Sequence, residues 1–154
     1  MSVRLGQFME FNGVLRTTQF AYWKFLGTCD ALLCVSHTLQ SALENGQEAR
    51  IVQIDLSAAF DRVSHLGILY KLFSVGIGGS VLSMLTQFLS NRSQHLMVDG
   101  CRSKLVDVVS GVSQGSVLGP LLFLLFISEL FFIMKNMLIG DADDSTLIET
   151  LLDG

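Results

Sequence analysis

The sequence feature that most constrains this fold is a long stretch without charge. Asp, Glu, Lys and Arg are all absent between Asp107 and Glu129, and the chain becomes densely apolar after Pro120. So many apolar side chains must leave water, inside a protein core or inside a membrane. A membrane span needs about 20 predominantly apolar residues, but Glu129 and Lys135 interrupt this one. We therefore expect a buried core helix with Pro120 in its first turn, ending near Met134.

Composition and charge point to a folded intracellular protein. Of the 154 residues, 50% are hydrophobic and only 16% are charged, which is too apolar for a disordered chain. The net charge of −4 gives no general basic field, so composition alone does not suggest a nucleic-acid partner. The three cysteines form no Cys-x-x-Cys pair, which favours reduced thiols. Segment 1–16 lacks the apolar run of a signal peptide.

The segments before this stretch alternate between helical and extended patterns. Apolar residues at helical spacing predict a helix over 30–43. A β-branched and aliphatic run predicts a strand over 50–56, with Asp55 near its C-terminal end. Ser64 and Ser80 each precede an apolar helical pattern, so we expect them to cap two further helices.

Two hairpins are also predicted. Asp99-Gly100 separates two extended runs within 91–110, and this dipeptide favours a type I′ turn. A second pair of extended runs, within 137–148, flanks the acid-rich turn 140–144. Helices mixed with hairpins predict an α+β fold.

Three acids end or follow apolar runs, where side chains can reach a shared cleft. These are Asp55 and the pair Asp143-Asp144. Carboxylates bind Mg²⁺, and two such ions about 3.5–4 Å apart can stabilise both the attacking and the leaving oxygens of a phosphoryl displacement. Acids are also common in turns because they hydrogen-bond their own backbone. From spacing alone, a metal site and an ordinary turn therefore both remain open.

Three motifs stand in order along the chain: QIDLSAAFDRV at 53–63, SGVSQGSVLGP at 110–120 and ADDSTL at 142–147. They resemble successive palm motifs of reverse transcriptases from non-LTR (LINE-type) retrotransposons. Segments 17–20 and 27–32 resemble the fingers segment that precedes the palm in this family. Because the order and the intervals also agree, the resemblance covers nearly the whole chain.

The resemblance implies a partial polymerase palm, an antiparallel sheet backed by helices, with part of the fingers. Residues 1–49 would form a fingers-side segment, and residues 50–154 the palm with interspersed fingers elements. The sequence ends ten residues after Asp144, so we expect the thumb to be absent.

The activity that the resemblance implies is RNA-directed DNA polymerisation. Asp55, Asp143 and Asp144 would coordinate two Mg²⁺ ions, with the Leu56 carbonyl as a backbone ligand. The primer 3′-hydroxyl would attack the α-phosphorus of a deoxynucleoside triphosphate and release pyrophosphate. The partners would be an RNA template, a DNA primer and deoxynucleoside triphosphates, with no membrane.

Four further positions match nucleotide-binding positions of the family. Phe60 matches the bulky residue that leaves no volume for a ribose 2′-hydroxyl, although an isolated Phe is also typical of a core. Gln114 and Gly115 match the loop beneath the templating pair, where glycine permits close backbone approach. Lys24 is the remaining cation of the fingers segment.

Five positions depart from the family pattern, among them Phe25 in place of a usual Gly and Arg16 in place of a usual Pro. Trp23 stands where the fingers carry Arg, Ser113 where the second motif carries Pro, and Asp141 where Tyr or Phe precedes Ala-Asp-Asp. In an extended backbone Asp141 would project beside Asp143 and join the other acids, so that repulsion raises their pKa values unless a metal neutralises them.

Two alternatives remain open, the first because of these departures and the expected absence of the thumb, the second because of the apolar stretch. One is a catalytically silent remnant that acts at most as a weak nucleic-acid or protein binder. The other is a membrane-associated product built around 117–139.

Overall fold

The computed structural model describes residues 2–23, 25–134 and 137–152. The chain divides into two compact units, Met1–Ser57 with Ile127–Gly154, and Ala58–Phe126. Helices and antiparallel strands occur together, which confirms the predicted α+β class. The assignment of 1–49 to the fingers side and 50–154 to the palm stays a prediction.

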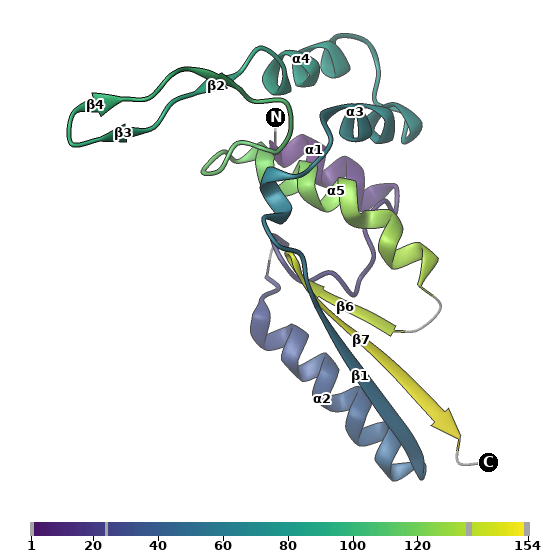
Figure 1. Cartoon of the computed structure of the whole chain (residues 1–154). Helices are drawn as coiled ribbons and strands as arrows, with labels where there is room; N and C mark the ends of the chain where they lie inside the picture. Colours follow the sequence, from purple (N-terminus) through teal and green to yellow (C-terminus); the bar gives the residue numbers. More distant parts are fainter. Residues whose placement is uncertain (1, 24, 135–136, 153–154) are drawn as a thin grey trace. The chain divides into compact units, whose positions relative to one another are not determined.

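A three-stranded antiparallel sheet forms the centre of the first unit. Its strands are β1 (Gln47–Asp55), β7 (Asp144–Leu152) and β6 (Met137–Asp141), in the order β1-β7-β6 (Figure 1). All nine residues of β1 pair with β7. The strand predicted over 50–56 begins later than β1, because the first residues of β1 carry no apolar strand pattern. Pairing with the long β7 extends β1 back to Gln47.

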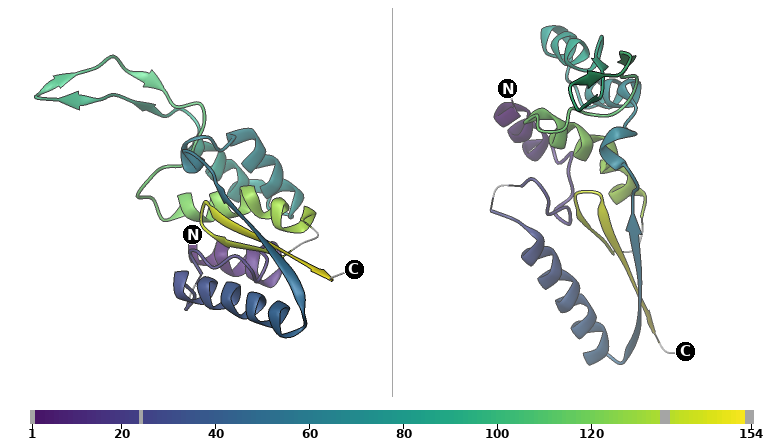
Figure 2. Two further views of the ribbon diagram at one scale, coloured as in Figure 1. Left: turned by 60° about the horizontal axis from the view of Figure 1, so that its bottom comes forward. Right: turned by 60° about the vertical axis from the view of Figure 1, so that its left-hand side comes forward.

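Helix α2 (Thr28–Glu44) runs along this sheet, as Figures 1 and 2 both show. Its buried Ala31 joins a hydrophobic cluster with Phe20, Ile139 and Ile148. The Asp30 carboxylate accepts a hydrogen bond of 2.9 Å from the Gly27 N–H, which satisfies a donor before the first turn. The helix predicted over 30–43 is thus confirmed.

The chain before α2 is bound to the outer edge of β6. The Phe20 N–H donates to the Gly140 carbonyl at 2.8 Å, and the Gly140 N–H donates to the Thr18 carbonyl at 2.9 Å. Gln19 between them is buried. Helix α1 (Ser2–Phe11) begins the same unit.

The second unit contains the short helix η1 (Ala59–Asp61), α3 (His65–Ser74) and α4 (Gly79–Leu89). As predicted, Ser64 caps α3, and its hydroxyl accepts a hydrogen bond from the Gly67 N–H at 3.2 Å. The prediction for Ser80 was wrong, because α4 begins at Gly79 after an extended N-cap, Gly78, without a side-chain cap.

The hairpin predicted within 91–110 forms an arm of the second unit (Figure 1). Its strands are β2 (Ser93–Gln94), β3 (Met97–Val98), β4 (Cys101–Arg102) and β5 (Val106–Asp107), each shorter than predicted. Strand β2 pairs with β5 and β3 with β4. Both turn residues, Asp99 and Gly100, have positive φ as a type I′ turn requires.

The uncharged stretch forms helix α5 (Leu118–Ile133). Leu122, Phe123, Leu124 and Leu125 are each at most 1% exposed, which confirms a core helix. Pro120 is its third residue and therefore interrupts no helical hydrogen bond. Within the described residues, every helix is too short or too polar to cross a bilayer.

Candidate active site

The register of the sheet places three acids in one row across its strands. Asp55, the last residue of β1, is paired with Asp144, the first residue of β7. Asp144 is also paired with Asp141, the last residue of β6. Directly paired residues project on the same face with their Cβ atoms about 4.5–5.5 Å apart. This end of the sheet (Figure 1) therefore concentrates negative charge.

Asp143 is not in this row, because it lies with Ala142 in the two-residue turn between β6 and β7. Ala142 has a φ of 62°, a left-handed conformation that costs a residue with a Cβ roughly 1–2 kcal/mol. The expectation that Asp141 projects beside Asp143 assumed that the strand continues. The turn ends that alternation, and the register pairs Asp141 with Asp144 instead.

The environment of the Tyr22 phenol opposes its ionisation. Partial burial raises the pKa of its phenol first, and the charges of Asp143 and Asp141 raise it further. Both carboxylates therefore act on the segment that precedes α2, since a neighbouring negative charge opposes formation of the phenolate.

Asp141 also has a direct partner on α2. The Thr28 hydroxyl donates a hydrogen bond of 2.6 Å to Asp141 Oδ2. Thr28 is the first residue of the helix, and the two residues are 113 positions apart in sequence. Local sequence patterns contain no signal for this contact.

Of the predicted metal ligands, Asp55 and Asp144 are paired in backbone register and Asp143 lies in the adjoining turn, but together they do not form a complete metal site. Across 2–23, 25–134 and 137–152, no group of three or more His, Cys, Asp or Glu side chains is arranged to hold a metal ion. The expected convergence of four carboxylates is therefore not met. The donor chemistry of Asp55, Asp143 and Asp144 fits Mg²⁺, which prefers carboxylate oxygens. Leu56, the predicted backbone ligand, directly follows β1.

In the second unit, the structure joins the first two sequence motifs. The Val112 N–H donates to the Phe60 carbonyl at 2.9 Å, and the Gly111 N–H donates to the Val63 carbonyl at 2.8 Å. At Gly111 a Cβ would lie 2.7 Å from the Asp61 carbonyl oxygen, and φ is +84°. Only glycine fits this crossing without strain.

Gln114 and Gly115 lie in the turn that follows. The Gln114 side-chain amide donates to Asp61 Oδ1 at 3.1 Å. Gly115 has a φ of +77° with open space around its Cβ position, so its backbone conformation, not crowding, favours glycine. Asp61 had no predicted role, and here its carboxylate holds the loop that carries Gln114.

Phe60 lies in η1 and stacks on Phe123 of α5. The ring centroids are 4.2 Å apart and the planes are inclined by 25°. The stack fixes the orientation of the Phe60 ring, which is only partly buried. Phe60, Gln114 and Gly115 thus all belong to the second unit, whereas the acids belong to the first.

The predicted fingers cation, Lys24, lies outside the described residues. Its neighbour Trp23, which replaces the Arg of the family pattern, has a buried indole N–H without a hydrogen-bond partner among the described residues. Leaving such a donor unsatisfied costs about 1–3 kcal/mol.

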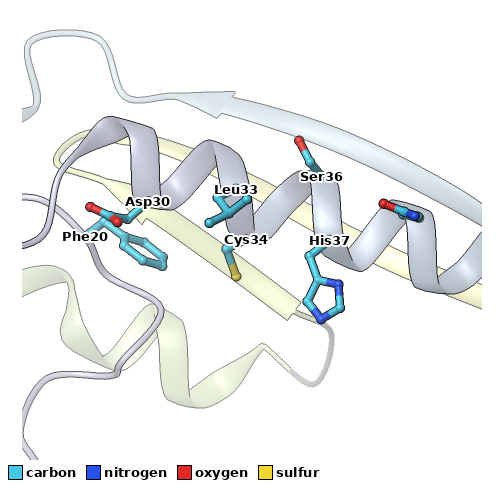
Figure 3. Close-up of a pocket in the computed structure, with 7 residues that line it drawn as sticks. Phe20, Asp30, Leu33, Cys34, Ser36 and His37 are labelled. Atoms are coloured by element: carbon cyan, nitrogen blue, oxygen red, sulfur yellow. The ribbon is translucent and has the colours of Figure 1, made fainter.

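A hollow of about 490 Å³ lies along one side of α2 (Figure 3). It contains none of the predicted site residues, and Asp30 within it is already the acceptor for Gly27. Its lining consists of Phe20, Asp30, Leu33, Cys34, Ser36, His37 and Gln40.

Comparison with known proteins identifies the family. Residues 2–150 match the family model described as reverse transcriptase (RNA-dependent DNA polymerase). The chain is 35% identical over 144 residues to the RNA-directed DNA polymerase from mobile element jockey of Drosophila funebris, covering 94% of this chain and 15% of that protein.

Two further relatives come from Drosophila melanogaster. Its jockey polymerase is 37% identical over 112 residues, covering 73% of this chain and 12% of that protein. The probable RNA-directed DNA polymerase from transposon X-element is 29% identical over 149 residues, covering 94% of this chain and 16% of that protein. The chain thus spans about one sixth or less of these relatives. It belongs to the reverse transcriptase (RNA-dependent DNA polymerase) family and corresponds to a stretch of a domain of the non-LTR, LINE type.

Proposed function

We propose that this chain carries the nucleotidyl-transfer centre of an RNA-directed DNA polymerase. The observation that supports this most directly is the pairing of Asp55 with Asp144 across β1 and β7, with Asp143 in the adjoining turn. Two acids from distant motifs thereby become neighbours on rigid strands, within a stretch that matches the family over residues 2–150.

In this proposal Asp55, Asp143 and Asp144 hold Mg²⁺, together with the Leu56 carbonyl. Two bound ions supply charge stabilisation to the attacking and leaving oxygens of phosphoryl transfer. The strand pair fixes the backbones of Asp55 and Asp144, and Asp143 directly precedes Asp144 in the two-residue turn. Asp55 and Asp144 are both exposed, so substrate phosphate oxygens have access to them.

We assign the nucleotide side to Phe60, Gln114, Gly115 and Lys24. The stack on Phe123 gives the Phe60 ring a defined orientation, as a steric filter against a ribose 2′-hydroxyl requires. The hydrogen bond to Asp61 likewise orients Gln114. The substrate class is then deoxynucleoside triphosphates, added to a DNA primer on an RNA template.

The net charge of −4 limits what this chain contributes to holding the template and primer. Nucleic-acid phosphates are bound by clustered Lys and Arg. We therefore assign to this chain the chemical centre rather than the main duplex-binding surface. An intracellular location is part of the proposal, supported by the free cysteines Cys29, Cys34 and Cys101.

The test is primer extension by the full chain on an RNA template with Mg²⁺. We expect extension by the wild type and its loss in Asp143→Ala. Asp107→Asn, at an exposed acid of the arm, is the matched control and should extend like the wild type. Absent extension by the wild type would remove the proposal and leave a catalytically silent remnant. Extension that survives Asp143→Ala would remove the assignment of the activity to this site.

A further inference from the structure

We infer that Asp141 is a positioning residue that ties the β6–β7 turn to the first turn of α2 through Thr28, and that it is not an additional metal ligand. The role of the turn in catalysis rests on the function proposed above. The contact itself is a property of the fold and can be tested separately.

The Thr28–Asp141 contact has the geometry of a strong hydrogen bond. The donor and acceptor oxygens are 2.6 Å apart, within the range for a hydroxyl that donates to a carboxylate. Thr28 begins a helix of 17 residues. The carboxylate therefore lies by the N-terminus of α2, where the helix dipole favours negative charge.

Backbone hydrogen bonds next to the Thr28–Asp141 contact hold the same end of β6. The residue before Asp141, Gly140, exchanges two backbone hydrogen bonds with Thr18 and Phe20. The segment before α2 and the first residue of α2 thus contact two successive residues at the end of β6. Since only Ala142 and Asp143 separate Asp141 from β7, this anchorage acts directly on the turn that carries the predicted metal ligands.

The strained turn explains why such an anchorage is useful. Ala142 holds a φ of 62°, which persists only where the surrounding structure determines it. Asp141 on one side of the turn and Asp144 on the other are paired in register. The contact of Asp141 with α2 fixes the β6 end of the turn. Asp144, at the β7 end, remains available as a metal ligand.

The sheet order argues against Asp141 as a metal ligand beside Asp55. Strand β7 lies between β1 and β6, so Asp141 and Asp55 are on opposite sides of Asp144. Two strand spacings separate them by roughly 9–10 Å. In addition, Oδ2 of Asp141 already accepts the Thr28 hydroxyl.

Hydrogen exchange on the full chain tests the anchorage. Thr28→Val removes the donor at nearly constant shape, and Asp141→Ala removes the acceptor. We expect each to speed exchange of the Gly140 amide about threefold to tenfold, with no further increase in the double variant.

Thr28→Ser and Asp141→Asn are the matched controls, because each keeps an oxygen that can make the contact. They should remain within about twofold of the wild type. Wild-type exchange in Thr28→Val, or effects that simply add in the double variant, would overturn the anchorage. The controls also separate loss of the contact from failure to fold.

Binding of Mn²⁺ alone, followed by electron paramagnetic resonance, tests the second half of the inference. Asp141→Asn should bind within about twofold of the wild type, whereas Asp143→Asn should lose at least about tenfold. An equal loss in both variants would make Asp141 a ligand and overturn the positioning role. If the wild type binds no Mn²⁺, the proposed function fails, while the exchange data still decide the anchorage.

Discussion

At the scale of single residues, glycine is required in this chain for two different reasons. At Gly140 the backbone is extended, and space is the constraint, because a Cβ would lie 2.5 Å from Cζ of Phe131. At Gly111 both a left-handed backbone and a carbonyl at 2.7 Å exclude a side chain. The clash at Gly140 is with the side chain of Phe131, which a smaller residue can relieve. The clash at Gly111 is with the backbone of Asp61, which no substitution removes.

The first prediction concerns Gly140→Ala, which we expect to lower the free energy of unfolding by about 1–3 kcal/mol through overpacking. Phe131→Leu removes the clashing ring, so the double variant should be less destabilised than the sum of the two single variants. Urea denaturation measures all three. Strict additivity would show that the ring is not the obstacle.

The second prediction concerns the phenol of Tyr22. Partial burial first, then Asp143 and Asp141, raise its pKa above the ordinary value of 10.0. The folded chain therefore holds this proton more tightly than the unfolded chain. The resulting stabilisation is complete below pH 10.0 and is lost as the pH rises through the higher folded pKa.

Ultraviolet titration in a Tyr70→Phe background isolates Tyr22, since the chain has only two tyrosines. Asp143→Asn removes one of the raising charges and should move the pKa of Tyr22 down, toward its ordinary value. An unchanged midpoint in Asp143→Asn would contradict the electrostatic contact between the turn and Tyr22.

At the scale of elements, local patterns predicted most helices and both hairpins. The helix over 30–43, the Ser64 cap and the turn at Asp99-Gly100 are all found. Each depends on interactions within a few residues, such as periodic apolar faces, caps and turn conformations. Strand lengths were wrong, since a strand extends only as far as its partner allows and that partner is distant in sequence.

The third prediction concerns the loop held against η1. Gly111→Ala combines left-handed strain with a clash against the Asp61 carbonyl, and should cost more than about 2 kcal/mol of unfolding free energy. Gly115→Ala is the matched control, because its φ is also positive but no atom lies within 4 Å. It should cost only about 1 kcal/mol. Equal losses in thermal or urea unfolding would show that the crossing of the two motifs is not tight.

At the scale of the whole molecule, binding of Mg²⁺ should be visible as stability. A ligand that binds only the folded chain stabilises it, by about 2.7 kcal/mol at one hundred times its dissociation constant. In this chain we expect Mg²⁺ to bind the folded state in preference to the unfolded state, because Asp55, Asp144 and Asp141 are brought together only on folding.

The fourth prediction is that Mg²⁺ raises the thermal midpoint of the wild type but not of Asp55→Asn. KCl at matched ionic strength is the control, since screening alone reduces repulsion between the acids. Calorimetry or circular dichroism measures the midpoint. An equal rise with KCl would mean that screening, and not a metal site, accounts for the effect.

The sequence by itself determined the α+β class, the core helix in the uncharged stretch and the family. These depend on periodicity and on ordered motifs, which are visible without coordinates. Only the tertiary structure decided that Asp144 lies between Asp55 and Asp141, that Asp141 contacts Thr28, and that Phe60 stacks on Phe123. Such contacts join residues that are far apart along the chain. They depend on strand register and packing, which no local pattern encodes.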